Sequence, residues 1–154
     1  MMPDDLLAKV DVLVDTALTW AQAHLGETRY ATWCLSFVED AFERGNNIEL
    51  DGYATAKEAA DGYGARDDGN VPPAGALAFY DWHGDINGID KNWGHVGLAL
   101  GDGRVIHALA EVRIDDYRDV VALLPPHASH SARYIGWASA SAVLKRSKLR
   151  IWDR

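Results

Sequence analysis

The chain is poor in cysteine, because its 154 residues contain only one, Cys34. A single cysteine excludes a disulfide within the chain and a cysteine-rich zinc site. Two roles remain for the thiol, a buried apolar side chain or a nucleophile. Free cysteines are among the most buried residues in proteins, so Cys34 alone does not favour catalysis.

Positive charge is also in short supply. The chain has 15 Lys and Arg against 23 Asp and Glu, which gives a net charge of −8. The only basic cluster is the C-terminal stretch 145–150, which resembles a solvated helix end. Binding to nucleic acid needs a basic face, so we expect no nucleic-acid partner.

Long hydrophobic runs are missing as well. No segment reaches the roughly 18 to 20 apolar residues that a membrane-spanning helix needs. The stretch 1–26 has neither the basic start nor the continuous apolar core of a secretory signal. We therefore expect no membrane partner, and a cytoplasmic location for the sequence as it stands.

The composition that is present, 48% hydrophobic and 25% charged residues, is that of a globular protein. The length predicts a single domain over residues 1–154. Apolar residues recur at helical spacing within 6–21 and within 28–45. Asp4 or Asp5 is expected to cap the first helix and Thr28 or Thr32 the second, with Gly26 and Gly45 as their respective ends.

A third, short helix is predicted by the capping box from Thr55 to Glu58. Beyond it the pattern changes to that of strands, at 76–80, 95–100, 104–114 and 132–138, with a last helix near 140–148. Residues 84–94 and 123–131 are predicted to be loops. Helices followed by an antiparallel sheet indicate an α+β fold.

Two histidines, His95 and His107, stand in neighbouring predicted strands. Side chains alternate between the faces of a strand, so the loop length decides whether the two share a face. A two-residue turn at 102–103 would place them on opposite faces. A three-residue loop at 101–103, ended by Gly103 in the left-handed region, would put His107 opposite Gly97 and beside His95. We favour this second register.

Cys34 is a candidate nucleophile that such a histidine pair could serve. A thiol early in a helix meets backbone amides and the positive end of the helix dipole, which lower its pKa. Nucleophilic catalysis by a thiol needs a base, and the base needs an orienting group. We therefore predict Cys34 as nucleophile, His95 as base at a strand start, and His107 as the residue that fixes the His95 tautomer. The alternative, two unrelated histidines on a strand pair, stays open at this point.

The motifs "WCLSFVEDAF", "PPAGALAFYD", "GHVGLALGDGRVIHA" and "YIGWA" resemble the NlpC-type cysteine peptidases of the papain-like superfamily, which is related to the CHAP amidases. The resemblance spans about Tyr30 to Trp137. It implies N-terminal helices packed on an antiparallel sheet, with the nucleophile in the N-terminal part of a helix. It also implies that Cys34, His95 and His107 are the catalytic residues and that no cofactor is needed.

The same resemblance implies cleavage of an amide bond through a thioester, typically in the peptide of peptidoglycan. We expect substrate contacts from five residues around the thiol and the strand ends: Tyr30, Trp33, Ser36, Trp82 and Trp93. The family usually has Asp-Cys-Ser-Gly at the nucleophile, whereas this chain has Trp33-Cys34-Leu35-Ser36. The resemblance therefore implies the family's chemistry more strongly than its substrate.

Three further possibilities belong with this prediction. Wall peptide lies outside the cytoplasm, so a wall-acting enzyme would be a phage-type lysin or an effector delivered by a secretion machine, with any delivery or immunity partner unknown. A second enzymatic hypothesis is transfer of the acyl group, or deamidation of another amide. A third hypothesis, without catalysis, is a binding module on the same scaffold.

The acidic stretch 81–90 lacks the glycine of a calcium loop, and we expect no metal there.

Overall fold

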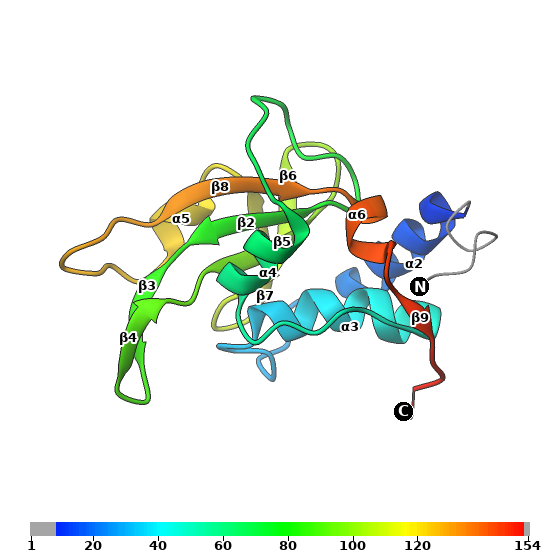
Figure 1. Cartoon of the computed structure of the whole chain (residues 1–154), viewed down its shortest axis with the longest axis horizontal. Helices are drawn as coiled ribbons and strands as arrows, with labels where there is room; N and C mark the ends of the chain where they lie inside the picture. Colours follow the sequence, from blue (N-terminus) through cyan, green and yellow to red (C-terminus); the bar gives the residue numbers. More distant parts are fainter. Residues whose placement is uncertain (1–8, 153–154) are drawn as a thin grey trace.

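A computed structural model describes residues 9–152 of the chain (Figure 1). Helices dominate the first part and strands the second. In chain order the elements are α2 (Val10–Gln22), α3 (Cys34–Asn46), β1 (Ile48–Glu49), α4 (Ala56–Tyr63), β2 (Leu77–Asp81), β3 (His83–Ile86), β4 (Ile89–Asn92), β5 (His95–Ala99), β6 (Arg104–Ala108), β7 (Val112–Asp116), α5 (Val120–Leu123), β8 (Arg133–Ala138), α6 (Ala140–Leu144) and β9 (Lys148–Leu149).

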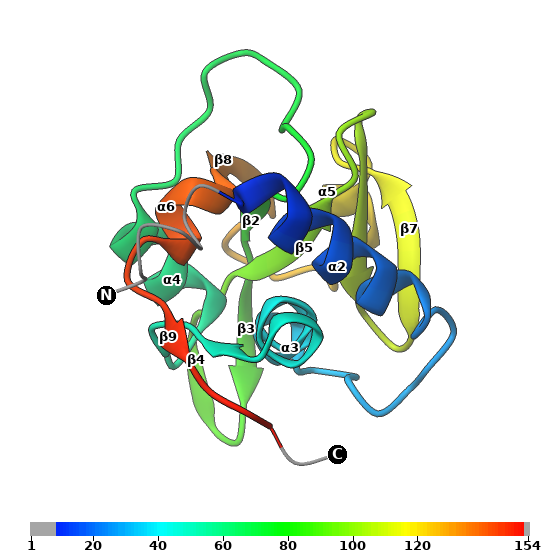
Figure 2. The ribbon, with the colours of Figure 1, turned by 90° about the vertical axis from the view of Figure 1, so that its right-hand side faces the viewer.

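The centre of the molecule is a five-stranded antiparallel sheet in the order β7-β6-β5-β2-β8. Helices α3 and α4 pack on one face of this sheet, with α3 against β5 and β6, and α2 packs on α3 as part of the same apolar cluster (Figure 2). The other face carries a smaller apolar cluster that includes Tyr80, Val105 and Val120. This is the predicted α+β fold. Among residues 9–152, none of the helices has the length and apolar character needed to cross a membrane.

Helix α3 begins at Cys34 because its apolar residues then face the sheet together. Phe37, Val38, Ala41 and Phe42 are all fully buried. The predicted caps at Thr28 and Thr32 are wrong: Trp33 stands at the N-cap position and makes no side-chain cap. The predicted stop at Gly45 is wrong too, because the helix runs to Asn46 and ends at Asn47 in the left-handed region, φ 54°.

Two other helix ends bear on the predictions. The capping box is confirmed, since the amide of Glu58 donates to Thr55 Oγ1 at 3.1 Å at the start of α4. The predicted caps Asp4 and Asp5 lie outside the described residues.

The loop between β5 and β6 has the predicted three residues. Leu98 pairs with Ile106 and Ala99 with Val105, and the amide of Leu100 donates to the carbonyl of Arg104 at 2.9 Å. Gly103 adopts φ 92°. In this register His107 stands opposite Gly97, so His95 and His107 share a face of the sheet.

Two strand predictions were wrong. Residues 84–94 are not a loop, because β3 and β4 form a hairpin whose turn residues Asn87 and Gly88 both have positive φ. Asn-Gly is the strongest two-residue hairpin signal, and it was present in the sequence. The predicted strand 104–114 is two strands, β6 and β7, which fold back on each other at residues 109–111.

Candidate functional site

Cys34 is the first residue of α3, and its side chain is partly exposed. The backbone amides of Val96, Leu35 and Cys34 itself lower the pKa of the thiol, but burial of its surroundings outweighs them and raises that pKa to about 11. The amides at the helix start thus lower the pKa of the thiol as predicted, but the net pKa lies above the ordinary value because burial is the larger effect. Loss of hydration penalises a thiolate more than the few amides at this site stabilise it. Cys34 is a neutral thiol at neutral pH.

His95 and His107 form a directly hydrogen-bonded pair. Nε2 of His95 lies 2.8 Å from Nδ1 of His107, and the two rings meet edge to face with centroids 5.1 Å apart. His95 is 4% exposed and His107 is fully buried. Burial and the neighbouring His107 lower the pKa of His95 to about 3, and burial lowers that of His107. Both rings are neutral at physiological pH.

The two histidines and α3 lie on different faces of the sheet. Val96 and Leu98 belong to the core beneath the helices. His95 points the other way, where its ring contacts Tyr80 at a centroid distance of 6.0 Å.

The start of α3 meets the sheet near the start of β5. The last paired residues of β5 and β6 on this side are Leu98 and Ile106, three residues from His95 and one residue from His107. Cys34 interacts with the backbone of Val96, the residue that follows His95. Among the described residues no hydrogen bond joins the thiol to the His95 ring. Catalytic hydrogen bonds are often long in ligand-free enzymes and shorten when substrate binds.

Gly94 explains why a glycine precedes the histidine. It has φ 72°, and a Cβ atom at this position would lie 2.6 Å from the backbone nitrogen of Lys57 in α4. The carbonyl of Trp93 also accepts a hydrogen bond from that Lys57 amide. The start of β5 is thus pressed against the start of α4, and only glycine fits there.

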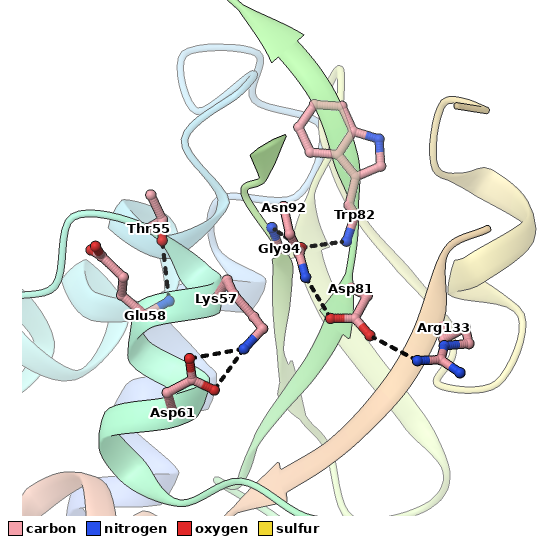
Figure 3. A network of polar contacts seen from close by, with 9 residues as sticks. All are labelled: Thr55, Lys57, Glu58, Asp61, Asp81, Trp82, Asn92, Gly94 and Arg133. Carbon is pink, nitrogen blue, oxygen red and sulfur yellow. Dashed lines mark hydrogen bonds and ion pairs between the residues drawn. The ribbon is translucent and has the colours of Figure 1, made fainter. Parts of the chain in front are cut away.

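Asn92 fixes the same strand end, and the sequence analysis missed it. Its Oδ1 accepts hydrogen bonds from the amides of Trp82 and Gly94, each at 3.0 Å, and its Nδ2 donates to Asp81 at 2.7 Å (Figure 3). Arg133 pairs with the other oxygen of Asp81 at 3.9 Å. These bonds form a polar bracket that holds the backbone at Asn92 and Gly94, directly before His95.

Asp115 is the second residue that the sequence analysis missed. Its Oδ2 lies 2.8 Å from Nε2 of His107, the nitrogen that His95 does not use. Arg113 donates to both oxygens of Asp115, at 2.7 and 3.0 Å. The stretch "VRIDD" contains a hint, because Arg113 and Asp115 are two residues apart and so share a face of a strand. A contact with His107 does not follow from a single strand over 104–114, because it requires β7 to fold back and pair with β6.

The five residues predicted to contact substrate are placed differently from one another. Trp33 is 62% exposed beside Cys34, and Ser36 is partly exposed in the first turn of α3. Trp82 and Trp93 meet at the base of the β3–β4 hairpin, where the amide of Trp93 donates to the carbonyl of Trp82. Both indole nitrogens are engaged, with Pro125 and Gly84 respectively.

Tyr30 points away from this group. It is 6% exposed, packs on Trp20 and Phe37, and donates its hydroxyl to Asp40 at 2.6 Å. It lines an open pocket of about 600 Å³ between α2 and α3, to which Cys34, His95 and His107 contribute nothing.

The acidic stretch 81–90 is occupied by local contacts. Asp81 binds Asn92, Asp85 accepts from the amide of Gly88, and Asp90 pairs with His127. Within residues 9–152 no three or more His, Cys, Asp or Glu side chains are grouped so as to hold a metal ion.

Comparison with known proteins gives a family match for this chain. The model of the NlpC/P60 family matches residues 22–123, which contain the helix of Cys34, both histidines and Asp115. No protein of curated function matches the chain. Since the matched segment covers about two thirds of the sequence and its fold is the one described above, the chain belongs to the NlpC/P60 family of cysteine peptidases and amidases.

Proposed function

We propose that this protein is a cysteine-dependent amide hydrolase in which Cys34 is the nucleophile, His95 the base and His107 its orienting partner. The observation that carries the proposal is the buried hydrogen bond of 2.8 Å between His95 and His107, next to a helix that begins with the cysteine. A buried histidine pair without a task would be a costly arrangement, because two polar rings have lost their hydration.

The reaction starts from a neutral thiol and a neutral imidazole. As the Cys34 sulfur attacks the carbonyl carbon, its proton passes to His95, and the carbonyl oxygen takes up negative charge near the first amides of α3. The C–N bond then breaks and His95 returns the proton to the leaving amine. Water, deprotonated by His95, hydrolyses the thioester and regenerates the thiol.

The substrate we propose is the peptide of bacterial peptidoglycan. Family membership supports a cysteine peptidase or amidase in general, and many members of the family cut wall peptide. Trp33 and Leu35 stand where the family usually has small polar residues, so we expect the peptide stem to be held by other groups, with the exposed Trp33 among them.

Digestion of purified muropeptides tests both parts of this proposal. We expect one defined cleavage product from the unaltered protein and none from Cys34→Ala or His95→Ala. Labelling with a thiol-directed amide mimic near neutral pH should fall at least tenfold in His95→Ala. Unchanged labelling in that variant would contradict the role of His95, and absence of any product with muropeptides would contradict the wall substrate.

Acyl transfer is a second candidate, favoured by the burial of the site. His95 and His107 are almost without solvent contact, and a dry thioester is better attacked by a bound amine than by water. Adding a primary amine such as glycine amide to the digestion distinguishes the two reactions. Transfer gives an amide of the added amine as main product, whereas hydrolysis gives the free acid at every amine concentration.

A further inference from the structure

The hydrogen bonds of the histidine pair continue into a carboxylate. The series of hydrogen bonds runs from His95 through His107 to Asp115, with two contacts of 2.8 Å, and ends at the guanidinium of Arg113. Antiparallel pairing of β6 with β7 produces this order: Arg113 stands opposite His107, and Asp115 is the diagonal neighbour on the same face. Each group therefore contacts the next without a water between them.

The ionised state of Asp115 determines which ring nitrogens of His107 and His95 carry a proton. An ionised carboxylate only accepts hydrogen bonds, so Nε2 of His107 must carry a proton. A neutral imidazole has one such proton, and His107 Nδ1 is therefore an acceptor. The hydrogen bond between the rings must then be donated by His95 Nε2, which leaves His95 Nδ1 without a proton and free to act as a base.

The opposite arrangement disables the site. If His107 carried its proton on Nδ1, it would donate to His95 Nε2, and the proton of His95 would have to sit on Nδ1. A thiol arriving at Nδ1 would then find no lone pair to accept its proton. The two tautomers of the pair thus differ in whether His95 is a base at all.

Arg113 keeps Asp115 in its ionised form. Asp115 is 16% exposed and is held by two hydrogen bonds from the guanidinium. Burial raises the pKa of this carboxyl, but the hydrogen bonds from Arg113 and His107 outweigh it and lower that pKa below its usual value. The side chain of Arg113 is 42% exposed, so its positive charge stabilises the Asp115 carboxylate while the guanidinium stays in contact with solvent.

We propose that Asp115, held by Arg113, is a positioning residue that sets the tautomer of His107 and, through it, leaves His95 Nδ1 free to accept the proton of the Cys34 thiol. This inference rests on the proposed function. It adds a fourth and a fifth residue to the predicted group of three, and it assigns the base to one nitrogen.

The test is Asp115→Asn, with Asp116→Asn as the matched control. Asp116 is the next residue of the same strand and pairs with Arg118 at the surface. We expect Asp115→Asn to lower kcat by about 10- to 100-fold with KM within twofold, because the base is lost while the substrate contacts remain. Asp116→Asn should stay within twofold in both. Asp115→Glu, which restores the charge, should regain part of kcat.

Ring ¹⁵N NMR supplies the readout that a structural role would not move. The unaltered protein should show His107 protonated on Nε2 and His95 protonated on Nε2, and Asp116→Asn should show the same. In Asp115→Asn the His95 signals should shift toward protonation on Nδ1. Retention of both tautomers in Asp115→Asn, or a kcat within twofold of the unaltered protein, would overturn the proposal.

The two proposals fail in different ways. A protein that cleaves no amide but shows the expected tautomers contradicts the proposed function and leaves the positioning role standing. An active protein whose His95 tautomer does not depend on Asp115 contradicts only the positioning role. Far-UV circular dichroism of each variant confirms that the fold is retained before either readout is interpreted.

Discussion

Burial, more than charge, sets the chemistry of the individual residues in this site. Cys34 begins a helix, where the amides and the helix dipole favour a thiolate, yet the pKa of its thiol is about 11. His95 faces no ionised partner, and its pKa of about 3 reflects burial first and the second imidazole after it. Both groups are therefore neutral in the resting protein, and proton transfer has to accompany attack.

The first prediction concerns the pH at which Cys34 reacts. In the ligand-free protein the thiolate population should rise only as the pH approaches 11, so alkylation by iodoacetamide should increase about tenfold per unit between pH 7 and 10. Alkylation rates measured by mass spectrometry over this range test it. A plateau reached below pH 8 would indicate a preformed thiolate–imidazolium pair instead.

The second prediction concerns acid stability. The folded-state pKa of His95 is about 3, below the unfolded value of 6.5. The unfolded chain therefore binds more protons between these values, and stability is fully present above pH 6.5 and is lost as the pH falls toward 3. The loss is at most about 1.4 kcal/mol per pH unit for this histidine.

Urea unfolding of the unaltered protein and of His95→Gln at pH 7.5, 6, 5 and 4.5 measures this contribution. The variant should lose stability less steeply with falling pH, because glutamine does not titrate. The difference between the two proteins at pH 7.5 serves as the reference. Parallel slopes below pH 6.5 would contradict a neutral, buried His95.

At the scale of elements, the placement of the site depends on contacts at strand and helix ends. The start of β5 is fixed by the Asn92 bracket and by the close approach of Gly94 to α4, and the start of α3 lies at the same end of the sheet.

The third prediction compares two glycines of this region. Gly94→Ala should destabilise the protein by about 2 to 4 kcal/mol, because the added Cβ meets the Lys57 backbone at 2.6 Å in addition to the positive φ. Gly103→Ala has a similar φ, 92°, but open space around its Cβ, and should cost about 1 kcal/mol. Urea unfolding of both variants tests the difference, and equal losses would show that the contact with α4 is unimportant.

The elements that were predicted correctly are those whose sequence signals lie within a few adjacent residues. The capping box of α4 and the three-residue loop after β5 depend on a few adjacent residues, and both were predicted correctly. The hairpin of β3 and β4 also had a local signal, Asn87-Gly88, but the many polar residues around it favoured a loop. Strand β4 is mostly exposed and β3 mostly half-buried, and neither has the apolar alternation of a strand with one buried face.

At the scale of the whole molecule, the sheet carries two apolar clusters of unequal size, and the larger one lies beneath α2, α3 and α4. Cys34 belongs to the helix side and the histidines to the other side. Cys34 interacts with the backbone of Val96, next to His95, so the packing of α3 on β5 and β6 places the thiol near the start of β5.

The fourth prediction tests that contact. Phe42→Ala on α3 removes a fully buried side chain from the larger cluster and should lower the free energy of unfolding by about 3 to 5 kcal/mol. Leu149→Ala, at a side chain that is 64% exposed, is the control and should change it by less than about 0.5 kcal/mol. Urea denaturation monitored by tryptophan fluorescence tests both. A loss below 1 kcal/mol for Phe42→Ala would mean that α3 is not part of the cooperative core.

The sequence by itself determined that Cys34 stands in a helix and that His95 and His107 stand in neighbouring strands, and it favoured the loop length that places both histidines on one face. These features follow from periodicity and turn chemistry, which are properties of neighbouring residues. Only the tertiary structure decided that Asp115 receives a hydrogen bond from His107, that Tyr30 faces another pocket, and that the thiol and the histidines are uncharged. Diagonal contacts between strands and the loss of hydration depend on which distant segments pack together, and no local pattern records that.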